Sequence, residues 1–280
     1  MSRSPAGAGP TGDDPSIAPT DLAPGRVTPG HATKPTARTL GAIPVVGLFL
    51  ALAGGLFGTG ETYEQVKQGS GAAELDEPVQ QWMVAHRVAW LDRLATIITD
   101  LGGKVWMPVL AAITVLALAR WWRTWTPVVV MLIATAGSLV MTTRGKTLTA
   151  RARPPFDQAV PPLETSASFP SGHTLNTVVI VTIVGYLVLL YVRSRIGRLL
   201  SCLGLALFAL LVASSRVYLG HHWLTDVLAG AAIGIAWAGA VILGHWLFVR
   251  LRTKDRAPTV RAVAQDHRET HDLAGPRHTG

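Results

Sequence analysis

Three short stretches of the sequence combine cations, histidines and a carboxylate, residue types that bind anions and move protons. They are KTLTARARP (Lys146 to Pro154), PSGH (Pro170 to His173) and SRVYLGHHWLTD (Ser215 to Asp226). Each stretch borders a long uncharged run. If those runs form helices packed side by side, the helix ends bring the three stretches to one place.

The cations of these stretches suit a phosphate group. Lys146 supplies a point charge, while Arg153 and Arg216 supply two planar forks for oxygen atoms. Ser171 and Gly172 stand where the following helix should begin, so backbone N–H groups and the positive helix end face an anion there. A glycine also lets a ligand approach the backbone closely. We therefore expect Lys146, Arg153, Ser171, Gly172 and Arg216 to hold phosphate.

The histidines and the aspartate predict phosphate transfer through a covalent intermediate. If a helix begins before His222, then His222 and Asp226 share one face of it, because they are four residues apart. Asp226 then orients one ring nitrogen and leaves the other as a nucleophile, whereas His221 would lie about 100° further round the helix. His173 is free to protonate the leaving oxygen and later to deprotonate water. The alternative role for Asp226 is only to cap the helix.

A zinc ion is the alternative ligand for His173, His222 and Asp226, since histidine and carboxylate commonly bind zinc. The nearby lysine and two arginines would repel a dication. The single cysteine, Cys202, leaves neither an internal disulfide nor a cysteine metal site to expect. We expect no metal and no other cofactor.

Membrane-spanning helices are the elements expected to position these residues. Hydrophobic residues make up 49% of the 280 residues and charged residues only 15%, which is too apolar for an ordinary soluble domain. A helix needs about 20 apolar residues to cross a bilayer. Six uncharged runs suggest such helices: Thr39 to Gly60, Val105 to Ala119, Thr124 to Thr143, Thr174 to Val192, Leu199 to Ser215 and Val227 to Val249. We predict an all-α polytopic bundle of six transmembrane helices.

Between the first two runs, apolar residues recur at helical spacing from Val79 to Leu101. This pattern predicts an amphipathic helix that lies on the outer membrane surface or packs over the bundle as a partial lid. The two ends of the chain are polar and carry no such pattern. We therefore predict a disordered tail over residues 1–38, a membrane domain over 39–250 and a second disordered tail over 251–280.

The formal net charge of +8 indicates membrane orientation rather than nucleic-acid binding, because the basic residues are dispersed at run ends and in the tails. Short connections carrying Arg120 and Arg123, and then Arg193, Arg195 and Arg198, mark the cytoplasmic side. Both tails are then cytoplasmic, and the three stretches lie on the outer face of a cell membrane.

Together the three stretches resemble the signature of the type 2 phosphatidic acid phosphatase superfamily, in order and in internal spacing. The resemblance implies a six-helix membrane core that acts on lipid phosphates without an obligatory metal. By the family's roles, His222 is the nucleophile, Asp226 its orienting partner and His173 the acid, and the five residues named above hold the phosphate. Arg144 and Arg151 are extra cations to which the signature assigns no role, and either contacts a second phosphate or simply water.

The favoured function is hydrolysis of a lipid phosphate or polyprenyl diphosphate through a phosphohistidine. Similar bacterial proteins act on undecaprenyl diphosphate, phosphatidylglycerophosphate or phosphatidic acid, and the sequence does not choose among them. Phosphotransfer to another hydroxyl would use the same residues, whereas a non-catalytic lipid-phosphate binding protein would need only the cations. Soluble vanadate-dependent haloperoxidases share the superfamily, but six membrane runs argue against that branch. The sequence does not predict an oligomeric state.

Overall fold

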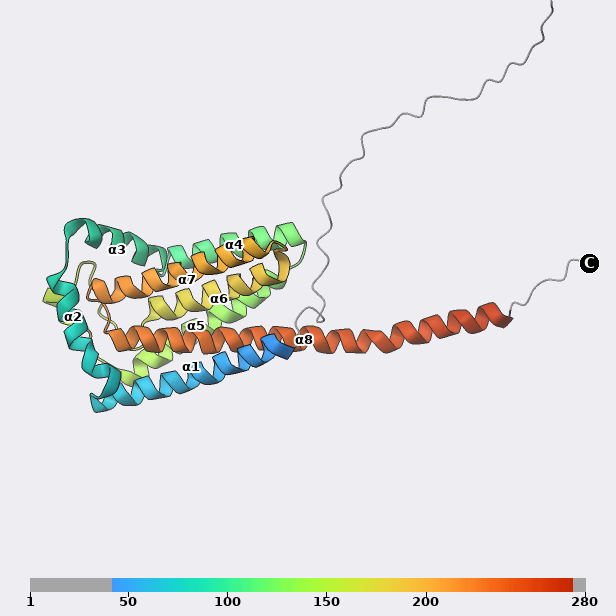
Figure 1. Ribbon diagram of the computed structural model, residues 1–280, viewed down its shortest axis with the longest axis horizontal. Coiled ribbons are helices and arrows are strands. Elements are labelled where there is room, and N and C mark those ends of the chain that lie inside the picture. The colour runs from blue at the N-terminus through green and yellow to red at the C-terminus, as the bar shows by residue number, and fades with distance from the viewer. Residues whose placement is uncertain (1–41, 274–280) are drawn as a thin grey trace, which may run out of the picture. The chain divides into compact units, whose positions relative to one another are not determined.

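The computed structural model describes the backbone of residues 42–273 and the side chains of residues 47–252. Within this part the chain is all-helical, which confirms the predicted fold class there (Figure 1). The helices are α1 (Ala42–Gln68), α2 (Asp76–Ala85), α3 (Ala89–Leu101), α4 (Trp106–Trp122), α5 (Thr126–Thr149), α6 (Gly172–Tyr191), α7 (Arg195–Tyr218) and α8 (Leu224–Leu273). Two short 3-10 turns, η2 (Gly71–Leu75) and η3 (Phe156–Gln158), lie in the connections.

Four of these helices are long and apolar enough to cross a membrane, namely α5, α6, α7 and the Leu224–Arg252 part of α8. Helices α3 and α4 meet the same criteria as a pair bent by 52°, so the described residues contain four or five candidate spans. Helix α1 covers most of the first predicted run but is not among them. The six-span topology therefore stays a prediction.

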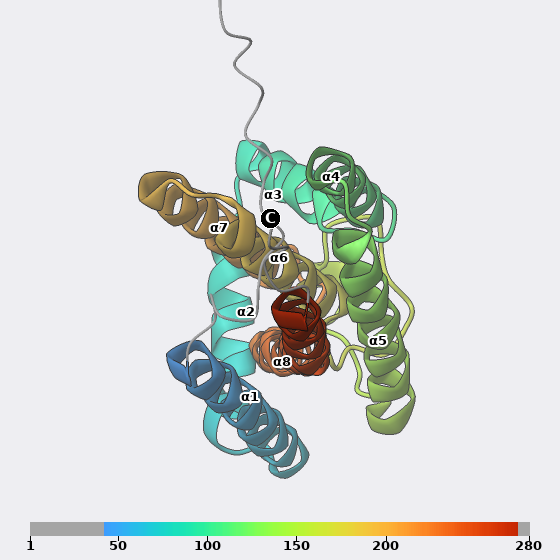
Figure 2. The same ribbon diagram turned by 90° about the vertical axis from the view of Figure 1, so that its right-hand side faces the viewer.

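Helix α6 is the central helix of the bundle. It packs against α5, α7 and α8, and Figure 2 shows it between α5 and α7 when the bundle is viewed end-on. Leu175, Val179, Ile183 and Leu187 recur every four residues along it and have no exposed surface. This apolar stripe on a helix face is the pattern of a core helix. Burial on several sides fixes the start of α6, and with it the PSGH stretch.

The single amphipathic helix predicted over Val79 to Leu101 is wrong, because the structure divides this segment into α2 and α3. The break lies at Arg87, which donates to the carbonyl oxygen of Tyr218 at 2.7 and 3.0 Å and to that of Gln158. The Val88 N–H lies 3.3 Å from the Tyr218 hydroxyl. These acceptors belong to distant parts of the chain, so the break has a tertiary cause. As a result α2 crosses the end of the bundle and α3 packs along α7 (Figure 1).

The bend between α3 and α4 depends on two glycines. A Cβ atom at Gly102 would lie 2.6 Å from Cγ1 of Val212 on α7, a distance that side chains do not tolerate. At Gly103 a Cβ atom would lie 2.8 Å from the Asp100 carbonyl oxygen and 3.5 Å from Nε2 of His173. The absence of side chains here lets the end of α3 reach both α7 and the start of α6.

The two predicted tails lie partly outside the residues that the structure describes. Residues 1–38 lie outside the described residues, as do residues 274–280. Over the rest of the second predicted tail the structure continues α8 as far as Leu273. Residues 251–273 include four arginines and three alanines, residue types that favour a helix once one has started.

Helices α1 and α8 pack closely at Gly55, and this contact generates a stability prediction. A Cβ atom at Gly55 would lie 2.6 Å from the Ala232 carbonyl oxygen and 2.8 Å from the Ala236 Cβ, whereas at Gly54 nothing lies within 4 Å. We expect Gly55→Ala to destabilise the purified protein by about 1–3 kcal/mol, because backbone must shift to admit the methyl group.

The matched control is Gly54→Ala, which should be neutral or slightly stabilising because alanine favours a helix. Thermal unfolding of the two variants in the same detergent measures the difference. Equal melting temperatures for both variants would contradict the observed α1–α8 contact.

Candidate active site

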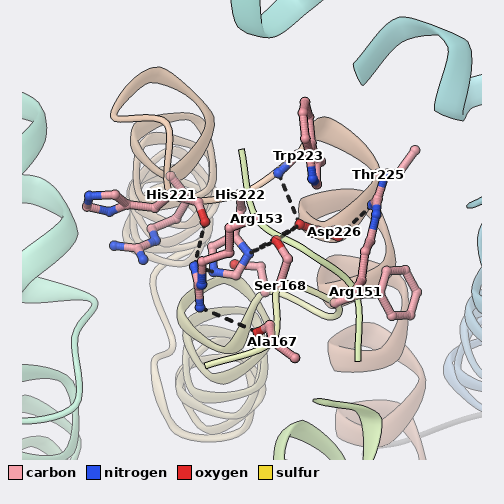
Figure 3. Close-up of polar contacts among 12 residues, drawn as sticks. Arg151, Arg153, Ala167, Ser168, His221, His222, Trp223, Thr225 and Asp226 are labelled. Carbon is pink, nitrogen blue, oxygen red and sulfur yellow. Dashed lines mark hydrogen bonds and ion pairs between the residues drawn. The ribbon is translucent and has the colours of Figure 1, made fainter. Parts of the chain in front are cut away.

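The three stretches meet at one end of the bundle, where α5 and α7 end and α6 and α8 begin. Figure 3 shows residues of the first and third stretches together with Ala167 and Ser168, which precede the second. Ala150 ends α5 in the left-handed conformation, with φ of 47°, and its N–H donates to the Lys146 carbonyl at 3.1 Å. The chain therefore changes direction after the helix. Arg151 and Arg153 follow this turn and reach the ends of α7 and α8.

Arg153 lies beside the ring of His222. Its Nη1 lies 3.3 Å from Nε2 of His222 and also donates to the His221 carbonyl oxygen. Its Nη2 donates to the Glu164 carboxylate at 3.1 Å. Burial lowers the pKa of Arg153, and the carboxylates of Glu164 and Asp226 oppose that shift. A guanidinium group stays charged despite such a shift, so a cation faces the ring.

Lys146 reaches the same place from the last turn of α5. Its Nζ donates to the Ala167 carbonyl oxygen, and Nη2 of Arg153 lies 3.4 Å from that oxygen. Nε of Arg153 donates to the Ser166 carbonyl at 2.7 Å. The structure thus brings together two of the cations predicted to hold phosphate, on the segment that leads to PSGH.

Arg216, the third predicted cation, is almost completely buried, with 2% of its surface exposed. Nη1 donates to Oγ1 of Thr99 at 3.0 Å, and Nη2 donates to the Glu164 carboxylate. Its Nε is buried without a hydrogen-bond partner among the described residues. A buried donor without a partner is costly, so Nε is a donor that an anion's oxygen can satisfy.

His222 and Asp226 are paired, although the reason given by the sequence needs correction. Helix α8 begins at Leu224, after His222 rather than before it, yet Nδ1 of His222 still lies 3.4 Å from Oδ2 of Asp226. Only 1% of His222 is exposed. Burial first, and then the charges of Arg216 and Arg153, lower the pKa of His222 well below its ordinary value. The ring is therefore neutral near pH 7, with a lone pair on one nitrogen.

Asp226 is a buried carboxylate that several donors share. Its Oδ2 accepts from the Ser168 hydroxyl and, at 3.0 Å, from the Trp223 N–H, and its Oδ1 accepts from Arg151 at 2.7 Å. The Trp223 contact caps the start of α8. Capping and facing His222 are thus both observed, so the two roles weighed for Asp226 do not exclude each other.

Arg151, which the sequence leaves between a second phosphate and water, is bound instead to two carboxylates. Besides Asp226, it donates to Oδ2 of Asp76 at 2.6 Å and to Oγ1 of Thr225 at 2.8 Å. Asp76 is the first residue of α2 and is buried, and it also accepts from the Thr225 N–H at 2.9 Å and from its hydroxyl at 2.6 Å. This network joins α2 to the start of α8. Arg144, the other extra cation, is exposed on α5.

Ser171 and Gly172 stand at the start of α6, as predicted, and both have structural partners there. Ser171 is the N-cap residue, its hydroxyl lies 3.0 Å from that of Thr174, and its N–H donates to the Asp226 carbonyl at 3.0 Å. A Cβ atom at Gly172 would lie 2.8 Å from Cγ2 of Thr142 on α5. The glycine is therefore required for helix packing, whether or not a ligand approaches it.

His173 joins the cluster through a carboxylate that the sequence analysis missed. Its Nδ1 lies 3.9 Å from Oε1 of Glu164, and its other nitrogen faces Gly103 at the bend between α3 and α4. Glu164 also binds Arg153 and Arg216. One carboxylate therefore contacts three of the residues to which the sequence assigns phosphate chemistry.

Several other contributors carry no signature of their own. They are Asp76, Thr99, Ser168 and Thr225, together with Glu164. Ser168 is two residues before PSGH, and Glu164 is one of two acids between the first two stretches, so position alone could have drawn attention to them. Nothing in the sequence points to Asp76 or Thr99, because their partners come from distant elements.

The other histidines with described side chains, His86, His221 and His245, have partners outside the cluster. A ring nitrogen of His221 lies 2.7 Å from the Val160 carbonyl oxygen, and burial lowers the pKa of His221 to about 4. His245 lies 2.7 Å from the Tyr186 hydroxyl, and His86 stacks on Trp82. In the described part of the chain, no three His, Cys, Asp or Glu side chains are grouped to hold a metal ion.

Several known proteins are similar to this chain in sequence. A family model described as the PAP2 superfamily matches residues 123–250, which include all three stretches. The chain is 31% identical to phosphatidylglycerophosphatase B of Bacillus subtilis (strain 168) over 162 residues, 57% of this chain and 78% of that protein. It is 28% identical to an undecaprenyl-diphosphatase of Sulfolobus acidocaldarius over 180 residues, 62% of this chain and 75% of that protein.

A solved structure agrees with these matches. It is a crystal structure described as the first transmembrane PAP2 type phosphatidylglycerolphosphate phosphatase from Bacillus subtilis. The TM-score is 0.60 with 28% sequence identity, and the match covers 71% of this chain and 94% of that one. From the family model, the similarity to the curated relatives and the shared fold, we conclude that the chain belongs to the PAP2 superfamily.

Proposed function

We propose that this protein is a membrane phosphatase that hydrolyses a lipid phosphate or polyprenyl diphosphate through a phosphohistidine, without a metal ion. The position of the His222 ring carries the proposal. Its Nδ1 faces Asp226 at 3.4 Å, and its Nε2 lies 3.3 Å from Arg153. One nitrogen is oriented by a carboxylate and the other is beside a cation that suits phosphate, as attack on phosphorus requires.

In the first step, a phosphate oxygen accepts the hydrogen bond from the Arg153 N–H that otherwise faces His222. The lone pair on Nε2 of His222 is then free. Nε2 attacks phosphorus, an N–P bond forms, and the bond to the leaving oxygen breaks. His173 donates a proton to that oxygen, and the negative phosphate favours the protonated form that this step needs. Asp226 stabilises the positive charge that develops on the His222 ring.

In the second step, His173 takes a proton from a water molecule, which attacks phosphorus and breaks the N–P bond. Inorganic phosphate leaves and the neutral His222 ring is restored. Lys146, Arg153 and Arg216 stabilise charge on the equatorial oxygens in both steps, and the unpartnered Nε of Arg216 supplies one of these donors. The other product is a lipid alcohol or, from a diphosphate, a lipid monophosphate.

The proposal includes six membrane spans with the site at the outer face. Helix α1 supplies the first span from its apolar part, and the bent α3–α4 pair supplies the second. Arg195 and Arg198 near the start of α7 mark the cytoplasmic side, at the opposite end of the helix from Arg216. A lipid substrate can then keep its tail in the bilayer while its headgroup reaches the cluster. The phosphatidylglycerophosphatase and undecaprenyl-diphosphatase relatives support this substrate class.

Arg151 has a positioning role in this proposal. It contacts the Asp226 oxygen that does not face His222, and Asp76 holds it from the other side. Removing Arg151 leaves two buried carboxylates without their shared cation, which disturbs the carboxylate that orients the nucleophile.

The central test measures phosphate release by the purified protein from a panel of lipid phosphates in the presence of a chelator. We expect the wild-type activity to persist, because the proposed mechanism needs no metal. His222→Ala and His173→Ala should each lower the rate at least about a hundredfold, since they remove the nucleophile and the acid.

His86→Ala is the control, because His86 is exposed and stacks on Trp82. Sustained turnover by His222→Ala would remove its covalent role, and loss of wild-type activity in chelator would favour the zinc alternative. The same assay with added alcohols identifies phosphotransfer, if phosphate appears on the acceptor instead of in solution.

The positioning role of Arg151 predicts a particular kinetic signature. Arg151→Met should lower kcat about ten- to a hundredfold, as is typical when a partner of a reacting group is lost, and should change KM little. Arg153→Met should raise KM as well as lower kcat, because Arg153 holds phosphate itself. Steady-state kinetics on one lipid phosphate separates the two patterns.

Arg144→Met is the matched control, since Arg144 is an exposed arginine seven residues earlier. Asp76→Asn should add little to the loss already caused by Arg151→Met, because the two residues act through one contact. A raised KM with unchanged kcat in Arg151→Met would instead return Arg151 to the phosphate-contacting role.

A further inference from the structure

Glu164 places a carboxylate among the cations that the proposed function assigns to phosphate. Its Oε2 accepts from Nη2 of Arg153 at 3.1 Å, and its Oε1 accepts from Nη2 of Arg216. The same Oε1 lies 3.9 Å from Nδ1 of His173. One carboxylate thus accepts hydrogen bonds from two guanidinium groups and faces one imidazole. In the proposed reaction all three of these groups act on the substrate phosphate.

This carboxylate is ionised at neutral pH. Burial alone would raise the pKa of Glu164, but the charges of Arg216 and Arg153 outweigh burial and hold the pKa well below its usual range. A phosphate group and a carboxylate both accept from guanidinium groups in the same planar geometry. The N–H groups that bind Glu164 therefore cannot bind phosphate at the same time, and the two anions repel each other.

Hydrogen bonds hold the chain before and after Glu164. Before it, the Val160 N–H donates to the Leu219 carbonyl at 2.9 Å. After it, the Ser166 carbonyl accepts from Nε of Arg153 at 2.7 Å. Residues 161–165 between these points belong to no helix and are exposed, except for Glu164, which is partly buried. The Glu164 side chain can therefore leave the cations without unwinding a helix.

We propose that Glu164 is a built-in competitor for the phosphate site, which a substrate phosphate displaces when it binds. This inference rests on the proposed function and adds an affinity-determining residue to it. The carboxylate keeps the buried Arg216 and the half-buried Arg153 paired between turnovers. It also returns to them after the second step, which favours release of inorganic phosphate.

The contrasting role for Glu164 is to orient Arg153 and Arg216 while phosphate binds beside it. The two roles predict opposite effects of neutralising the carboxylate. If Glu164 competes, Glu164→Gln leaves the cations more often available, and an anion binds more tightly. If Glu164 only orients the cations, the same variant binds an anion more weakly.

The test measures binding of orthovanadate, a phosphate analogue, to the full-length protein purified in detergent. For Glu164→Gln we expect the Kd of orthovanadate to fall at least about tenfold, as when a larger fraction of the protein becomes competent to bind. We also expect the unliganded variant to melt at a lower temperature than wild type, because the buried Arg216 and the half-buried Arg153 lose their charged partner. Glu74→Gln is the control, since Glu74 is an exposed acid in η2.

An unchanged or raised Kd in Glu164→Gln would overturn the proposal. If that variant does not fold, Glu164→Asp keeps the charge on a shorter side chain, and we expect its Kd to lie below that of wild type. A higher Kd for Glu164→Asp would also overturn the proposal. Wild-type protein that neither binds orthovanadate nor releases phosphate from lipids would reject the proposed function itself, whereas failure in the Glu164 variants alone rejects only this inference.

Discussion

The buried carboxylate of Asp226 is the group on which this end of the protein depends. It has no exposed surface, and a buried charge is tolerated only when it is paired and hydrogen-bonded. Its partners come from the segment after α5, the segment before α6 and the residues before α8, through Arg151, Ser168 and Trp223. His222 lies beside the same oxygen as two of these donors. The need to satisfy one charge therefore joins the first and third stretches to the segment that leads into PSGH.

The parts of the structure that follow from local pattern could be predicted from the sequence. Uncharged runs predicted most of the long helices, and because helix ends lie together in a bundle, the signature residues converge. The pairing of His222 with Asp226 was expected for a helix that in fact begins two residues later. The contact survives because the same carboxylate accepts a hydrogen bond from the Trp223 N–H, which keeps the preceding residue, His222, close.

What could not be predicted depends on partners far apart in the chain. Apolar residues recur at helical spacing on both sides of Arg87, so the sequence around it does not indicate a break. In the structure the Arg87 side chain donates to the carbonyl groups of Tyr218 and Gln158, and the helix is divided at this residue. Single acids such as Asp76 and Glu164 have no periodic pattern, and their role appears only when the structure shows which arginines they pair with. The cations can be identified in the sequence. Which of them pair with carboxylates, and which have donors available to a ligand, cannot.

The contact between Asp76 and Arg151 has a practical consequence. Asp76 begins α2, which crosses the end of the bundle (Figure 1). An amphiphile that displaces α2 would also displace Arg151, which contacts the carboxylate beside His222. Micelle composition can therefore change the geometry of the candidate active site, and preparations of equal purity in different detergents need not have equal activity.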